Sequence, residues 1–250
     1  MFAISRVQNN AKILVIILIT AIMVAFTLMF SVQAFLAETP KETEPEYFEF
    51  NSDTGTITDY DPSGGLEIVI PSKIAGVNVS KIGVGAFYKN DLTLVRIPEG
   101  VMEIAKQAFQ GNNLSSIEIP NSVKVIGAWA FGKNNLTTLV IRRGEEVNRK
   151  GPESPGLKEI GKQAFYENNL VNLEIPESVE IIGDWAFGNN ELTSVLIPDS
   201  IRKMGKGVFY NNNLTSVKVP SVEVIREGLF VKNDLITAEI AVGVKEIEKD

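Results

Sequence analysis

The side chains that most often carry out enzyme chemistry are missing from this chain, which contains no His and no Cys. Ser-His-Asp and Cys-His nucleophile systems therefore cannot form. Zinc sites built from Cys and His, iron–sulfur clusters and haem ligated by His or Cys are excluded as well. The 31 Asp and Glu residues would still allow a carboxylate-based hydrolase, but no paired acid site departs from the pattern described below. We therefore expect no enzyme activity and no bound cofactor.

One short segment has the composition of a metal site. Residues 59–65, DYDPSGG, are similar to the start of a calcium-binding loop. The twelfth position of that loop falls on Ile70, where an EF-hand needs Glu. Together with residues 51–55, the segment is better explained as hairpin turns, so we predict no metal site.

Residues 1–34 have the order of an export signal. Two basic residues precede an uncharged, apolar run over residues 13–30, and a small-residue cleavage pattern ends at Ala34. The run is also just long enough to span a bilayer, so a retained N-terminal membrane anchor is the alternative to a cleaved signal peptide. Both interpretations place the rest of the chain outside the cytoplasm, either secreted or at the cell surface. Residues 35–46 are polar and contain Pro, as is typical of a linker.

The charge of the remainder restricts its partners. Residues 1–34 hold two basic and no acidic residues, so residues 35–250 carry 22 basic and 31 acidic residues, a net charge of −9. Such an acidic surface argues against nucleic acid, whose phosphates need a basic face. It also argues against an anionic membrane surface. Any contact with a membrane is therefore expected only through the N-terminal segment.

A repeat of 22 residues dominates the sequence. A representative copy is LSSIEIPNSVKVIGAWAFGKNN, which starts at Leu114. The copy that starts at Leu136 has 12 extra residues, a looser copy starts at Leu66, and an incomplete one starts at Leu235. The other clear copies start at Leu92, Leu170, Leu192 and Leu214.

Each copy predicts one strand and one turn. Ile117 and Ile119 alternate with a polar residue, as in a short strand, and Pro120 ends that strand because it has no N–H to donate. Ala130 and Phe131 are expected in a helical or 3₁₀ turn with the Phe inside the coil. A single copy cannot bury its apolar side, so the copies must stack. The predicted fold is a solenoid over residues 66–250, with one parallel strand per ~22-residue coil, short helical, 3₁₀ or strand segments on the convex side, and an N-terminal capping module over residues 47–65.

The pattern L-x-x-I-x-I-P-x-S-V-x-x-I-G-x-x-A-F-x-x-N-N resembles the BspA-like leucine-rich repeat family over about residues 66–248. The resemblance implies a bacterial, non-enzymatic binding scaffold that is exported or displayed at the cell surface, but it identifies no ligand. It also implies that one Asn in each coil occupies a position where the family usually has Cys. We assign that position to Asn112, Asn134, Asn168, Asn189 and Asn211.

The outward positions of the strands form the broad face on which we expect a protein partner, from the host or from a cell surface. They mix both signs of charge with aliphatic side chains, which suits protein contacts and adhesion. A solvated face or a passive structural spacer is the alternative. The residues predicted to contact the partner are Arg96, Glu118, Val140, Glu174, Leu196 and Lys218.

An insertion over residues 142–156 is the clearest departure from the repeat. Its Gly and Pro residues predict a protruding loop, and insertions in repeat proteins often lie on a binding face. We therefore add its basic residues to the predicted partner site, with a drifted, solvated loop as the alternative. They are Arg142, Arg143, Arg149 and Lys150.

Two tryptophans, Trp129 and Trp185, raise a second possibility, a glycan or cell-wall binding site on the convex side. A regularity in the sequence favours packing instead. Each Trp lies two positions before the Phe of its coil, and the residue just after that Phe is then a glycine, Gly132 or Gly188. Several coils without Trp have a Tyr in that later position. The two positions are three apart and share one face of a helical turn, so the aromatic rings are expected to fill one strip from alternating sides.

Overall fold

The computed structural model describes residues 41–143 and 156–248. The predicted export segment, residues 1–34, lies outside the described residues, as do Arg149 and Lys150. The chain divides into two units, and the second, Glu42–Asp250, contains all the repeats. Within the described ranges, no helix has the length and apolar character needed to cross a membrane.

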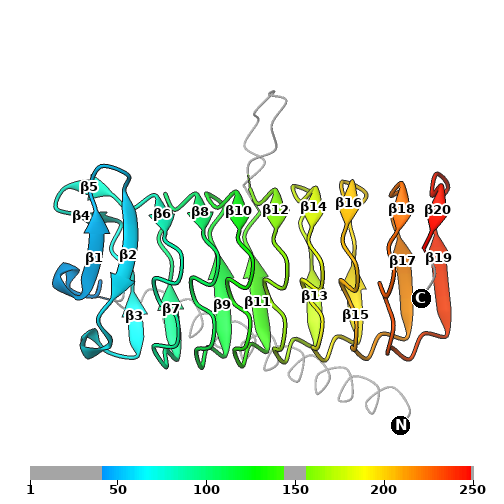
Figure 1. The fold of residues 1–250 in the computed structure, drawn as a ribbon, viewed down its shortest axis with the longest axis horizontal. Coiled ribbons are helices and arrows are strands. Elements are labelled where there is room, and N and C mark those ends of the chain that lie inside the picture. The colour runs from blue at the N-terminus through cyan, green and yellow to red at the C-terminus, as the bar shows by residue number, and fades with distance from the viewer. Residues whose placement is uncertain (1–40, 144–155, 249–250) are drawn as a thin grey trace, which may run out of the picture. The chain divides into compact units, whose positions relative to one another are not determined.

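The repeats form a solenoid in which most coils contribute one longer and one shorter strand (Figure 1). The longer strands are β3 (Glu67–Val69), β7 (Leu94–Arg96), β9 (Ser116–Ile119), β11 (Thr138–Ile141), β13 (Asn172–Glu174), β15 (Ser194–Leu196), β17 (Ser216–Val219) and β19 (Thr237–Ile240). The two-residue strands are β6 (Lys81–Ile82), β8 (Glu103–Ile104), β10 (Val125–Ile126), β12 (Glu159–Ile160), β14 (Ile181–Ile182), β16 (Lys203–Met204), β18 (Val224–Ile225) and β20 (Glu246–Ile247). The predicted leucine-rich-repeat solenoid is confirmed, with a short strand on the convex side.

The strands stack in parallel and keep the phase of the repeat. β9 pairs with β11 so that Glu118 lies opposite Val140, and β13 pairs with β15 so that Glu174 lies opposite Leu196. The longer strands pair two by two, as β3–β7, β9–β11, β13–β15 and β17–β19, and these pairs lie side by side (Figure 1). Because the register preserves the repeat, residues at one repeat position form a column along the solenoid.

The N-terminal end is covered by a hairpin of β1 (Phe48–Asn51) and β2 (Thr56–Tyr60). β2 pairs in parallel with β6, so the hairpin and six of the shorter strands form one sheet in the order β1-β2-β6-β8-β10-β12-β14-β16, while β18 and β20 pair with each other. The chain before the hairpin also lies against the solenoid, since Thr43 N donates to Val69 O at 2.9 Å and Val69 N donates to Thr43 Oγ1 at 3.0 Å. The first turns, η1 (Pro45–Tyr47) and η2 (Pro62–Gly64), are 3₁₀ helices, and a small hairpin of β4 (Lys73–Ile74) and β5 (Val77–Asn78) follows.

A column of stacked phenylalanines fills the solenoid. Neighbouring rings have centroids 4.8–6.0 Å apart and lie within 12° of parallel. All but the last are completely buried, so each removes one of the largest apolar surfaces in its coil from water. The column contains Phe87, Phe109, Phe131, Phe165, Phe187, Phe209 and Phe230.

A column of asparagines lies beside the rings and joins successive coils through hydrogen bonds. Asn134 Nδ2 donates to Phe109 O at 2.9 Å and to Phe131 O at 3.1 Å, and its Oδ1 accepts from Leu114 N at 3.2 Å. The assignment of this position to Asn189 and Asn211 is wrong. The residue three positions after the Phe makes these bonds, so the column is Asn112, Asn134, Asn168, Asn190, Asn212 and Asn233.

The segment around the Ala-Phe pair is a turn that relies on left-handed backbone. Trp129 and Lys133 flank Phe131 with φ of 61° and 58°, and the other coils repeat this geometry. Asn tolerates such a conformation better than most residues, and Asn189 and Asn211, both with φ of 53°, occupy it here. The predicted end of the strand is confirmed, because β9 ends at Ile119, directly before the proline of its coil.

Candidate interaction surfaces

The outward residues of β3, β7, β9, β11, β13, β15, β17 and β19 form a broad surface, called here the long-strand face. Strand pleating points alternate side chains outward, and the inward partners are the buried residues of the core. Two aliphatic residues stand out on this face, Val140 with 47% and Leu196 with 62% of its surface exposed. All six strand residues expected to contact a partner are exposed here, namely Arg96, Glu118, Val140, Glu174, Leu196 and Lys218.

The insertion leaves the long-strand face at the end of β11, and its first residues return to that face. Arg142 pairs with Glu118 and lies 3.9 Å from Glu99, measured from Nη1 to Oε1. Arg143 pairs with Glu174. The two arginines expected to meet a partner are therefore already paired within the chain. These pairs connect the start of the insertion to Glu118 and Glu174, two other residues of the predicted partner site.

The coils on either side of the insertion remain stacked. β10 pairs with β12, with Val125 opposite Glu159 and Ile126 opposite Ile160. In the ordinary coil that contains β9, three residues separate Ile119 from Val123. In the coil with the insertion, 15 residues separate the corresponding pair, Ile141 and Leu157. Ile141 and Leu157, on the two sides of the insertion, are both buried, so the core continues from one coil to the next.

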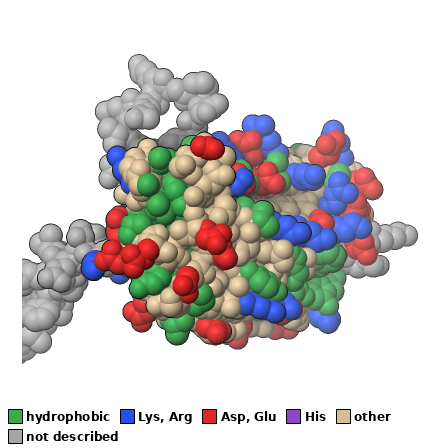
Figure 2. All heavy atoms as spheres, turned by 60° about the vertical axis from the view of Figure 1, so that its left-hand side comes forward, with side chains coloured by type: hydrophobic (Ala, Val, Ile, Leu, Met, Phe, Trp, Pro, Cys, Tyr) green, Lys and Arg blue, Asp and Glu red, His purple; other side chains and the backbone are tan. Residues whose placement is uncertain are grey.

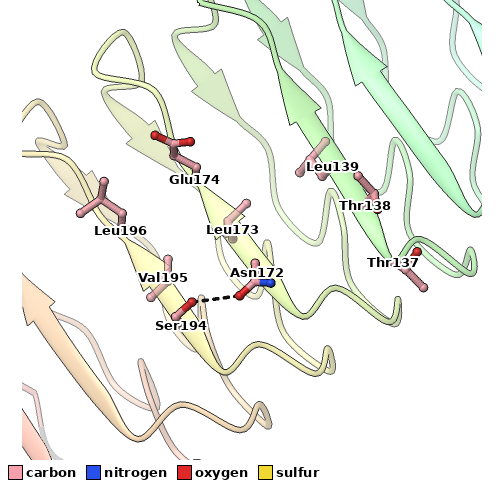
Figure 3. A pocket seen from close by; sticks show the side chains of 9 residues that line it. All are labelled: Thr137, Thr138, Leu139, Asn172, Leu173, Glu174, Ser194, Val195 and Leu196. Carbon is pink, nitrogen blue, oxygen red and sulfur yellow. Dashed lines mark hydrogen bonds between the residues drawn. The ribbon is translucent and has the colours of Figure 1, made fainter. Parts of the chain in front are cut away.

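A groove of about 520 Å³ crosses the long-strand face beside the insertion (Figure 3). It lies over β11, β13 and β15, where no strand pairing joins β11 to β13. At one end Ser194 Oγ donates to Asn172 Oδ1 at 3.1 Å, and at the other Glu174 and Leu196 form the rim. Its lining consists of Thr137, Thr138, Leu139, Asn172, Leu173, Glu174, Ser194, Val195 and Leu196. The sequence alone did not predict this groove.

Charges on the described surface are mixed, and many are paired between coils (Figure 2). Glu180 shows the pattern, with Lys158 Nζ at 3.1 Å and Arg202 Nη1 at 3.6 Å. The hydrogen bond from Lys158 lowers the pKa of Glu180. Such exposed pairs each contribute little to the free energy of unfolding. No cluster of carboxylates able to hold a metal ion occurs among residues 41–143 and 156–248.

The convex aromatic side chains pack against one another and against glycines of neighbouring coils. The Trp129 and Tyr166 rings meet edge to face at 5.5 Å, and burial raises the pKa of the Tyr166 hydroxyl. A Cβ at Gly207 would lie 2.2 Å from Trp185 Nε1, so the larger ring needs a glycine beside it. This contact agrees with the expected packing of the aromatic strip.

Lysines cover the faces of these rings. Lys133 Nζ lies 5.9 Å from the Trp129 ring centroid, and Lys162 Nζ lies 5.5 Å from that of Trp185. Lys89 over Tyr88 and Lys232 over Tyr210 repeat the arrangement at 5.1 Å. A hydrogen bond with the Tyr210 hydroxyl raises the pKa of Lys232. Ring faces covered in this way are less accessible to a neutral sugar than the sequence suggested.

A family model described as "BspA type Leucine rich repeat region" matches residues 67–151 and 152–250, with six copies of the repeat. Among solved structures, a T. pallidum leucine-rich repeat protein is 26% identical, with a TM-score of 0.53 over 80% of this chain and 82% of that one. A leucine-rich repeat protein from Bacteroides ovatus is 22% identical, with a TM-score of 0.37, covering 77% of this chain and 66% of the other. No curated protein matches the chain.

Proposed function

Because this chain belongs to the BspA-type leucine-rich repeat family, we propose that it is an exported, non-enzymatic module that binds another protein through its long-strand face. Leucine-rich repeat proteins of this kind are typically interaction modules without catalytic activity. The absence of His and Cys from the whole chain agrees with that class. The apolar run over residues 13–30 supports secretion or anchoring at the cell surface.

The observation that carries the proposal is the meeting of three features at one place. The insertion begins directly after β11, one of the strands under the groove. Val140 is exposed on that strand, and Leu196 is exposed at the rim of the groove. Glu174, also at the rim, is paired with Arg143. Exposed aliphatic side chains around a satisfied ion pair resemble the centre of a protein interface, where charges are neutralised and apolar surface is buried.

The proposal predicts that the insertion contributes to binding without supporting the fold. Residues 142–156 can be replaced by Pro-Asn-Ser, the three residues that make the same connection in the coil of β9. Full-length chains with and without this replacement should be screened against extracellular proteins and glycans at physiological salt. We expect a protein partner whose affinity falls at least about tenfold, a loss of about 1.4 kcal/mol, in the replaced chain.

Circular dichroism and the unfolding midpoint of the replaced chain provide the control. Both should match those of the parent, because the coils on each side of the insertion stack directly through β10 and β12. A protein partner that binds both chains equally would argue against a role for the insertion. A chain that binds none of the extracellular proteins would support a spacer instead.

A further inference from the structure

Four successive coils each place one exposed lysine on the convex turns, two residues after or three residues before the stacked Phe. Backbone hydrogen bonds fix these turns against one another, for example from Lys133 N to Tyr166 O at 2.8 Å and from Trp129 N to Lys162 O at 2.9 Å. Stacked coils are spaced by about 4.8 Å, so the four ammonium groups extend over about 15 Å. This lysine row consists of Lys89, Lys106, Lys133 and Lys162.

The row keeps most of its positive charge. Among the described residues, Glu167 is the one carboxylate that pairs with any of the four lysines, lying 3.8 Å from Lys133 Nζ. In the coils after Lys162, the residue three positions before the Phe alternates in charge, from Asp184 to Lys206 to Glu227. Lys206 and Glu227 pair with each other at 2.8 Å. The positive strip is therefore confined to these four coils, although the chain as a whole has a net charge of −7.

Aromatic rings hold three of these lysines in place. Lys89, Lys133 and Lys162 lie over the rings of Tyr88, Trp129 and Trp185, respectively. Attraction between an ammonium group and a ring face restricts a side chain that would otherwise be very flexible. A ligand that binds to restricted lysines loses less conformational entropy on association.

We propose that the lysine row binds a linear anionic polysaccharide that runs along the solenoid axis. The four lysines follow one another coil by coil along the solenoid and alternate between two positions of the turn, so they form a zigzag strip that suits a single polymer chain carrying a regularly repeated anionic group. A nucleic acid duplex presents phosphates over a wider surface and needs a correspondingly broad basic face. Here the short strands just before the row carry Glu103 and Glu159, so the basic strip is narrow. This site is separate from the long-strand face and does not depend on the proposed protein binding.

The test compares two triple variants of the full chain that lose the same charge. Lys89→Gln, Lys106→Gln and Lys162→Gln remove the row lysines that have no carboxylate partner among the described residues. Lys73→Gln, Lys203→Gln and Lys245→Gln remove three exposed lysines, from β4, β16 and the residue just before β20, as the matched control. The probes are dextran sulfate and polygalacturonate, which distinguish sulfate from carboxylate recognition, together with uncharged dextran and a DNA duplex.

We expect the parent and the control variant to bind at least one anionic polysaccharide, and the row variant to bind it at least about tenfold more weakly. The slope of log affinity against log salt should fall by about 2 in the row variant, by analogy with three contacts to a single-stranded nucleic acid. Glu167→Gln should strengthen binding. Equal losses in the two triple variants, equal binding of uncharged dextran, no binding by the parent, or tighter binding of the duplex than of either polysaccharide would each overturn the proposal.

Discussion

Asn134→Ala should lower the free energy of unfolding by about 3 kcal/mol, although it removes only a small polar group. The change leaves Leu114 N without an acceptor inside the solenoid, at a cost of about 1–3 kcal/mol. It also removes one of the two donors to Phe109 O and to Phe131 O, which keep only Asn112 and Asn168, respectively. Because each carbonyl keeps one donor, each of these lost bonds adds only about 0.5 kcal/mol.

Urea unfolding followed by circular dichroism measures this effect. Asn113→Ala is the matched control, because Asn113 is exposed and changes there usually alter stability by less than about 0.5 kcal/mol. A loss for Asn134→Ala no larger than that of the control would show that the asparagine column does not hold the coils together.

Phe165→Ala should be more destabilising still, by about 3–5 kcal/mol. The ring is completely buried and stacks on Phe131 and Phe187, with centroids 5.4 Å away on each side. Its removal leaves a cavity in the middle of the phenylalanine column, where neighbouring coils cannot close in without breaking their strand pairing. Since each coil contacts only its neighbours, the interface between the two halves should weaken most.

The unfolding transition of the Phe165→Ala chain should therefore lose cooperativity, with hydrogen exchange faster in the coils next to residue 165. Phe230→Ala is the control, because this ring has a stacking partner on one side only, Phe209 at 5.6 Å, and is partly exposed. We expect it to cost less than half as much. Equal losses of unfolding free energy for the two changes would contradict the claim that each coil is stabilised by its contacts with the coils on both sides.

Much of this fold could be predicted because its core residues recur at a fixed period. Ile119 and Phe131 recur in nearly every coil, and only stacking can bury them, so strand, turn and solenoid all follow from the pattern. The short strands could not be predicted with the same certainty, since two residues such as Val125 and Ile126 contain no alternation to recognise. Their pairing depends on the neighbouring coils.

The errors and omissions concern contacts across coils. Asn189 and Asn190 are adjacent and identical in type, and only the spacing of three residues from Phe187 distinguishes the buried one. The pairing of Arg142 with Glu118 joins residues 24 positions apart and depends on the coil register. Sequence reasoning placed both residues in one site but treated the arginine as free.

The central claim, that the long-strand face binds a protein, is tested most directly by changing exposed aliphatic residues on the two sides of the solenoid. Val140→Asp with Leu196→Asp alters the long-strand face, and Met102→Asp with Ile181→Asp alters the opposite surface, where those residues are 54% and 37% exposed. The affinity of each double variant for the protein found in the screen is the measurement. We expect about a hundredfold weaker binding for the first pair, since interface residues of this kind contribute about 1–2 kcal/mol each, and less than about threefold for the second. Equal losses for the two pairs, or a loss confined to the second, would contradict the claim.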